Sequence, residues 1–178
     1  MKKLISITIM FLPVLVLAPL ATYSGEYQKA PTTHSKDFDK MKDLVGVWEG
    51  KADTGKGTEM IKATYELTSA GNAIVERLFV GQPHEMVTVY YDFNGQLSMT
   101  HYCSLGNQPH MDIMNSGEKD MIFVLSEKNP NLSSLKETHM HALKISFDGM
   151  DTITHTWTLY ENGEKKSHVV IKLVRVRA

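Results

Sequence analysis

The stretch that decides the fold is HMHALKISFDGMDTITHTW, residues 139–157. Apolar residues and histidines alternate with polar residues in both halves of the stretch, and side chains two apart on a β-strand share a face. This pattern predicts a β-hairpin with arms at Thr138–Phe147 and Asp151–Tyr160. Its apolar face carries three imidazole rings, those of His139, His141 and His155. An unpaired ring is costly to bury. The three rings must therefore find hydrogen-bond partners or face a cavity that holds something.

The chain on both sides of the hairpin alternates in the same way and is divided by turn sequences. Asn94-Gly95 and Asn162-Gly163 are the strongest hairpin signals. The other predicted strands are 45–53, 58–68, 73–80, 85–92, 96–103, 109–115, 120–126 and 164–177. The only longer loop in this prediction is 127–137. About ten antiparallel strands with short connections favour an all-β closed up-and-down barrel, because closure removes the exposed edges.

A short helix is predicted before the first strand. Ser35 is a suitable N-cap, and Phe38, Met41 and Val45 recur at helical spacing. The helix is expected over residues 36–44, with its apolar side packed against the barrel.

The N-terminus has the pattern of a secretory signal. Lys2 and Lys3 precede an apolar run, Leu4–Leu20, and small residues stand near a cleavage point after Ser24. The alternative is a membrane anchor, but the run is near the lower length limit for a span and contains two prolines. The prediction is an exported protein, periplasmic or secreted, with no stable membrane association after cleavage. Its parts are a signal peptide at 1–24, a flexible leader at 25–34 and one barrel domain at 35–178.

Composition and charge indicate which classes of partner the protein can bind. Apolar residues make up 42% and charged residues 22% of the chain, as in soluble globular proteins. The formal charge of −1, without a basic stripe, argues against nucleic acid as a partner. Cys103 is the only cysteine, so an internal disulfide and a lipoprotein anchor are both excluded. A small molecule is the expected partner, and the oligomeric state stays open.

Strand parity predicts which side chains line the barrel lumen. An eight- to ten-strand barrel can hold one small ligand. Residues on the apolar faces therefore form a candidate ligand site, namely His101, Cys103, Glu76, Trp157, Arg175 and Met99. The leading hypothesis is a binding protein that holds a small apolar or amphiphilic ligand in the lumen. No catalytic residue is predicted, because Cys103 lacks an adjacent base and an oxyanion motif.

The second hypothesis is a metal or haem site built from His139, His141, His155 and His101. If Phe147 lies opposite Asp151, His141 and His155 become diagonal neighbours across the hairpin. Imidazoles at such spacing can share one zinc ion about 2 Å from each nitrogen. Metal-assisted hydrolysis is a possible activity of this arrangement. A third hypothesis is a structural module whose barrel is filled by its own side chains.

Several segments carry resemblances to known families. The helix followed by Gly46-Val47-Trp48-Glu49-Gly50 resembles the start of lipocalins, of fatty-acid-binding proteins and of the haem-binding barrels called nitrobindins. The segments 85–90, 100–103 and 106–109 resemble an uncharacterised family of exported bacterial proteins. The resemblances imply a calycin-type barrel, with Arg175 as a ligand anchor by comparison with fatty-acid-binding proteins. No motif matches the haem-ligating histidine of nitrobindins, and His168 lies only in the corresponding region.

Overall fold

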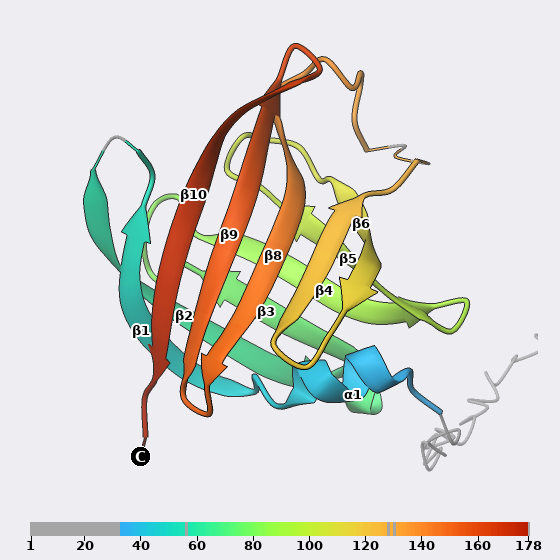
Figure 1. The fold of residues 1–178 in the computed structure, drawn as a ribbon, viewed down its shortest axis with the longest axis vertical. Coiled ribbons are helices and arrows are strands. Elements are labelled where there is room, and N and C mark those ends of the chain that lie inside the picture. The colour runs from blue at the N-terminus through green and yellow to red at the C-terminus, as the bar shows by residue number, and fades with distance from the viewer. Residues whose placement is uncertain (1–32, 56, 128, 130, 178) are drawn as a thin grey trace, which may run out of the picture. The chain divides into compact units, whose positions relative to one another are not determined.

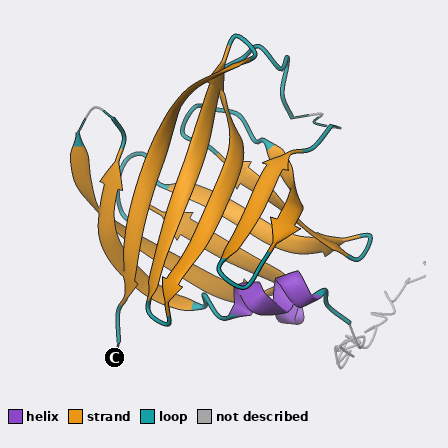
Figure 2. Cartoon of the chain, viewed as in Figure 1, coloured by secondary structure: helices purple, strands orange, loops and turns teal. Residues whose placement is uncertain are grey.

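The chain forms a closed antiparallel barrel (Figures 1 and 2). The computed structural model describes residues 33–55, 57–127, 129 and 131–177. In this part of the chain the ten strands are β1 Gly46–Asp53, β2 Thr58–Thr68, β3 Ala73–Leu78, β4 Met86–Phe93, β5 Gln96–Tyr102, β6 His110–Ser116, β7 Asp120–Leu125, β8 His139–Gly149, β9 Thr152–Glu161 and β10 Glu164–Arg175. Each strand pairs with its neighbours in the chain, and β1 pairs with β10 to close the barrel. The predicted all-β barrel is confirmed, and this strand order is consistent with the predicted up-and-down topology.

In the described part of the chain, the α-helix α1 (Lys36–Lys42) precedes the strands and lies at one end of the barrel (Figure 1). It ends two residues before the predicted boundary. Phe38 and Met41 are buried as expected, whereas Val45 is 39% exposed. Leu44 takes its place in the core at 1% exposure, because the chain has already left the helix.

Ser35 holds the start of α1, as the sequence predicts. Its Oγ accepts a hydrogen bond from the backbone N–H of Phe38 at 3.0 Å and donates one to Asp92 Oδ1 at 2.6 Å. The backbone N–H of Ser35 also donates to Asp92, at 2.7 Å to Oδ2. The cap thus ties the helix to the end of β4.

We expect Ser35→Ala to lower the free energy of unfolding by about 1–2 kcal/mol, because the substitution removes both the cap and the bond to Asp92. Urea denaturation monitored by circular dichroism measures this loss. Ser35→Thr is the control, since it keeps the hydroxyl and should lose less than half as much. Equal losses in the two variants would contradict the role of the hydroxyl.

The predicted signal peptide at 1–24 and almost all of the predicted leader lie outside the described residues. In the described part of the chain, no helix has the length and apolar character needed to span a membrane.

The β8–β9 hairpin forms where it was predicted, but its predicted register is wrong by two residues. Leu143 lies opposite Trp157, and Ile145 lies opposite His155. A two-residue shift leaves every side chain on its predicted face, since side chains alternate with period two. The pairing also slips by one residue between Met140 and Ala142. His141 is therefore the extra residue of a β-bulge, which re-aims side chains locally.

The end of the barrel near α1 is filled by side chains. Trp48, Phe38, Leu97 and Met111 have no exposed surface. Arg175 closes this end, and its guanidinium lies 4.2 Å above the Trp48 ring. It donates hydrogen bonds to the carbonyl oxygens of Asp43 and Val45 and pairs with Asp151 at 3.3 Å. The predicted lumenal role of Arg175 as a ligand anchor does not fit this placement, because its donors are already engaged at the α1 end.

Candidate functional site

A row of polar side chains crosses the inner wall of four adjacent strands. Tyr65 on β2 pairs with Glu76 on β3, Glu76 pairs with Thr88 on β4, and Thr88 pairs with His101 on β5. All four side chains are at most 1% exposed. The row exists because the pairing places one inward residue of each strand at the same height. It places four polar side chains next to one another on the inner wall of the barrel.

Glu76 is the centre of the most deeply buried contacts. Tyr65 Oη donates to Glu76 Oε1 at 2.6 Å, and Tyr90 Oη donates to Glu76 Oε2 at 3.0 Å. His155, from the opposite wall on β9, reaches the same group, with Nε2 2.9 Å from Tyr65 Oη and Nδ1 3.5 Å from Glu76 Oε1. A carboxyl group, two phenols and an imidazole therefore meet inside the barrel. We call these four residues the Glu76 cluster.

The hydrogen bonds of the Glu76 cluster fix the tautomer of His155. The Tyr65 hydroxyl uses its proton for Glu76, so it accepts from His155, whose Nε2 must carry a proton. Burial lowers the pKa of His155, although the Glu76 carboxylate opposes this shift. The pKa values of Tyr65 and Tyr90 lie well above the usual value, mainly through burial and secondarily through Glu76. The ring of His155 is accordingly neutral, and its Nδ1 makes no hydrogen bond within the described part of the chain.

His101 and Trp157 form the next level of the lumen, toward the end opposite α1. Their ring centroids are 4.4 Å apart, and His101 Nδ1 lies 2.9 Å from Thr88 Oγ1. Burial lowers the pKa of His101 to about 3, so this ring is neutral as well. Trp157 Nε1 is buried and has no hydrogen-bond partner in the described part of the chain. By contrast, Trp48 Nε1 donates to the carbonyl oxygen of Leu44 at 2.8 Å.

A small cavity lies at the end of the barrel away from α1, where β8 begins. Its volume is about 200 Å³. Its lining residues are Leu125, Ser126, Glu127, Leu135, His139, His141, Tyr160 and Gly163. The Tyr160 ring stacks on His141 at 3.8 Å, and His139 Nε2 lies 3.2 Å from His141 Nδ1. Burial first, and the neighbouring His139 second, lower the pKa of His141. We call this space the mouth cavity.

The loop after β5 joins the same end of the barrel. Asn107 donates to Glu137 Oε1 at 3.0 Å and to the carbonyl oxygen of Thr138 at 2.9 Å, which ties the loop to the start of β8. Cys103 precedes Asn107 in the chain and is buried. Its backbone N–H donates to the carbonyl oxygen of Asn107. Burial raises the pKa of the Cys103 thiol. This environment gives a protonated thiol and favours packing over nucleophilic chemistry.

The structure brings the predicted site residues together in pairs and leaves some apart. Glu76 meets His155, His101 meets Trp157, and His139 meets His141. Met99 is fully buried on β5, two residues before His101. The four histidines of the predicted metal site are not gathered around one point, because the observed register separates His155 from His141. Within the described residues, no group of three or more His, Cys, Asp or Glu side chains is placed to hold a metal ion.

Three members of the site were missed in the sequence. Tyr65, Thr88 and Tyr90 lie on the inward faces of their strands and carry the hydroxyls that satisfy Glu76 and His101. Strand parity was the available signal, since Tyr65 alternates in step with Ile61 and Ala63.

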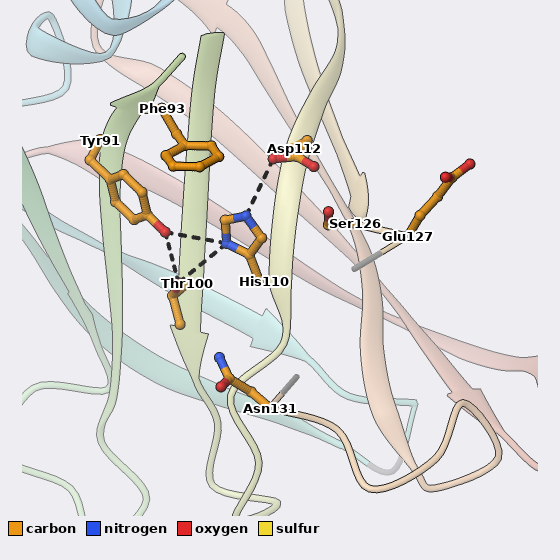
Figure 3. Close-up of a pocket in the computed structure, with 8 residues that line it drawn as sticks. All are labelled: Tyr91, Phe93, Thr100, His110, Asp112, Ser126, Glu127 and Asn131. Atoms are coloured by element: carbon orange, nitrogen blue, oxygen red, sulfur yellow. Dashed lines mark hydrogen bonds and ion pairs between the residues drawn. The ribbon is translucent and has the colours of Figure 1, made fainter. Parts of the chain in front are cut away.

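A larger groove, of about 650 Å³, lies on the outer face of β4, β5 and β6. Figure 3 shows the Tyr91 hydroxyl and the Thr100 side chain directed at the His110 ring. Tyr91 Oη and Thr100 Oγ1 lie 3.3 and 3.4 Å from His110 Nδ1, and His110 Nε2 lies 3.4 Å from Asp112 Oδ1. Asp112 in turn accepts from Ser98 at 2.7 Å. These polar groups already pair with one another.

Comparison with known proteins supports the fold. No protein-family model matches the chain, and no curated protein matches it significantly. Among solved structures it is similar to Rv2717c from M. tuberculosis, with a TM-score of 0.55 and 12% identity over 82% of this chain and 100% of that one. It is also similar to a protein of unknown function from Nostoc punctiforme in the DUF3598 family, with a TM-score of 0.50 and 14% identity. That match covers 76% of this chain and 49% of the other. At these identities the similarity concerns the barrel fold alone.

Proposed function

We propose that the protein is an exported binding protein that takes a small amphiphilic molecule at the mouth cavity, with a polar end directed into the lumen. The observation that carries the proposal is the buried indole N–H of Trp157, which has no acceptor among the described residues. A buried donor without a partner costs about 1–3 kcal/mol. Trp157 does not itself line the mouth cavity, so the hydrogen-bond acceptor of the ligand must extend past the lining residues into the lumen to recover this free energy. Export rests on the signal-like pattern of residues 1–24.

The chemistry of the lumen favours a neutral acceptor, such as a carbonyl oxygen, over a carboxylate. Arg175, the basic residue expected to meet a ligand carboxylate, is engaged at the α1 end of the barrel. The buried ionisable side chains deeper in the lumen include Glu76 and the neutral imidazoles of His101 and His155. A second carboxylate beside them would lose its hydration without gaining a cation.

The volume of the mouth cavity limits the size of the ligand. Benzene fills an apolar cavity of about 150 Å³ in an engineered protein, and the mouth cavity measures about 200 Å³. Leu125 and Leu135 provide its apolar wall, and Tyr160 provides an aromatic face. A single aromatic ring or a short alkyl chain with one carbonyl group fits these dimensions.

The lumen is a better candidate than the outer groove, although the groove is larger. In the groove, His110, Asp112 and the neighbouring hydroxyls satisfy one another. In the lumen, Trp157 Nε1 and His155 Nδ1 are buried and form no hydrogen bond with any described residue. A ligand that forms a hydrogen bond with a buried unpartnered group gains binding free energy. A group that is already paired must first break its existing hydrogen bond.

Calorimetric titration with benzamide and with toluene tests the proposal. We expect benzamide to bind at least tenfold more tightly, because both molecules carry one aromatic ring but only benzamide has a carbonyl acceptor for Trp157. Filling the mouth cavity with Leu135→Trp should weaken benzamide binding by at least tenfold. Met114→Trp is the matched control, since Met114 is also an exposed hydrophobic residue but does not line the cavity.

Equal affinities for benzamide and toluene would contradict the role of the acceptor. Unchanged benzamide binding in Leu135→Trp would contradict the location. The absence of heat with both compounds would overturn the proposed ligand class.

A further inference from the structure

The bulge in β8 brings two imidazole nitrogens to a separation that suits one metal ion. His139 Nε2 and His141 Nδ1 are 3.2 Å apart. Two nitrogen ligands about 2.0–2.1 Å from a tetrahedral zinc ion are separated by about 3.3 Å. Residues two apart on a regular strand lie about 6.5 Å apart along it, so the irregular pairing between Met140 and Ala142 is part of how the two rings meet.

The contacts of His139 leave the correct nitrogen free. His139 Nδ1 lies 2.7 Å from the carbonyl oxygen of Glu137, to which it can only donate a proton. In the neutral ring Nε2 then carries a lone pair, and this atom faces His141. A backbone carbonyl that holds the far N–H of an imidazole is the usual support of a metal-binding histidine. His141 is held in turn by the Tyr160 ring, which stacks on it at 3.8 Å.

We infer that His139 and His141 form a two-histidine site for a late first-row divalent metal ion, of which zinc is the test case. When metal is absent, the two rings form a hydrogen bond with each other. The two histidines therefore have a favourable contact both with and without the metal ion. In the metal-free pair His141 Nδ1–H donates to His139 Nε2. When the ion binds, His141 gives up its Nδ1 proton to water and takes one up at Nε2, so that the neutral ring offers a lone pair at Nδ1 and both facing nitrogens bind the ion. Imidazole ligands suit zinc, copper and nickel better than calcium or magnesium.

The mouth cavity leaves room for the remaining ligands. Both histidines line it, together with Ser126 and Glu127. In the described part of the chain no third His, Cys, Asp or Glu completes the pair as a preformed metal group. Water or a small molecule in the cavity therefore fills the open positions, as in metal sites that exchange a ligand. This inference adds a metal to the mouth cavity and does not depend on binding of an organic ligand at Trp157.

Calorimetric titration of the purified, tag-free protein with Zn²⁺ tests the site. We expect one saturable site, with affinity reduced at least tenfold in His139→Ala and in His141→Ala. His84→Ala is the control, because His84 is a partly exposed turn residue away from the cavity and should leave zinc binding unchanged. Copper should bind more tightly than zinc at the same site.

His139 is buried, so its replacement can also disturb the packing of the barrel. The decisive variant is therefore His141→Ala. His141 is only partly buried, and thermal unfolding of this variant checks that the barrel is intact. Absence of zinc binding in the native protein, or equal affinities in the native protein and folded His141→Ala, would overturn the metal site. Neither result bears on the benzamide proposal, because that experiment measures binding of a different ligand and concerns Trp157 instead of His141.

Discussion

Replacing Glu76 with leucine should lower the free energy of unfolding by about 3–5 kcal/mol, one of the largest losses for a single substitution in this chain. Glu76 is fully buried and accepts hydrogen bonds from Tyr65 and Tyr90. Leucine leaves both hydroxyls without an acceptor in the core. Urea denaturation at neutral pH measures the difference. Glu66→Leu is the matched control on the neighbouring strand, where the side chain is exposed, and should change stability by less than about 0.5 kcal/mol.

A rescue variant separates lost hydrogen bonding from poor packing. Glu76→Leu combined with Tyr65→Phe and Tyr90→Phe removes the orphaned hydroxyls, and should recover most of the stability lost in Glu76→Leu alone. Additive losses in the triple variant would contradict the account, since they would show that the hydroxyls have no shared partner. A loss below about 1 kcal/mol in Glu76→Leu would contradict it as well.

Acid should destabilise the barrel before most carboxyl groups titrate, and His101 should account for much of this effect. Burial lowers the pKa of His101 from 6.5 to about 3 in the folded protein. As the pH falls below 6.5, the unfolded chain takes up a proton at His101 that the folded protein does not bind. Stability from this group is therefore complete above pH 6.5 and is lost as the pH falls toward 3. The loss approaches about 1.4 kcal/mol for each pH unit.

His155, whose pKa burial also lowers, adds to the slope in the same direction. Urea midpoints between pH 5 and 8 measure the slope. His101→Gln removes the titrating group, so its stability should vary less with pH below 6.5. His168→Gln, at an exposed position on β10, should keep the native slope. Equal slopes in the native protein and His101→Gln would contradict a neutral, buried His101.

Strand alternation predicted most of the architecture. All ten predicted strand starts fall within one residue of the observed ones. His101, His139 and His155, which alternation assigns to inward faces, are buried. These successes share a cause, because period-two alternation depends only on local geometry and on burial. The lipocalin-like type and export stay predictions.

The alternation of apolar and polar residues did not predict the strand register or the β-bulge. The observed register of β8 and β9 differs from the predicted one by two residues. Both registers place the same side chains on the inward face, so alternation cannot distinguish them. The bulge at His141 has no signal in residue type, and it is at this bulge that His141 Nδ1 lies 3.2 Å from His139 Nε2. Arg175 shows the same limit, since its position on an inward face does not tell which end of the barrel it occupies.

A ¹H–¹⁵N spectrum of the indole N–H groups, recorded during a benzamide titration, shows whether the ligand reaches Trp157. The chain has two tryptophans. Trp48 Nε1 already donates to Leu44, whereas Trp157 Nε1 has no partner among the residues that the structure describes. Assignment follows from Trp48→Phe. We predict that the Trp157 signal moves downfield and saturates, while the Trp48 signal stays in place. Saturable binding with an unmoved Trp157 signal would contradict a ligand held by Trp157 in the lumen.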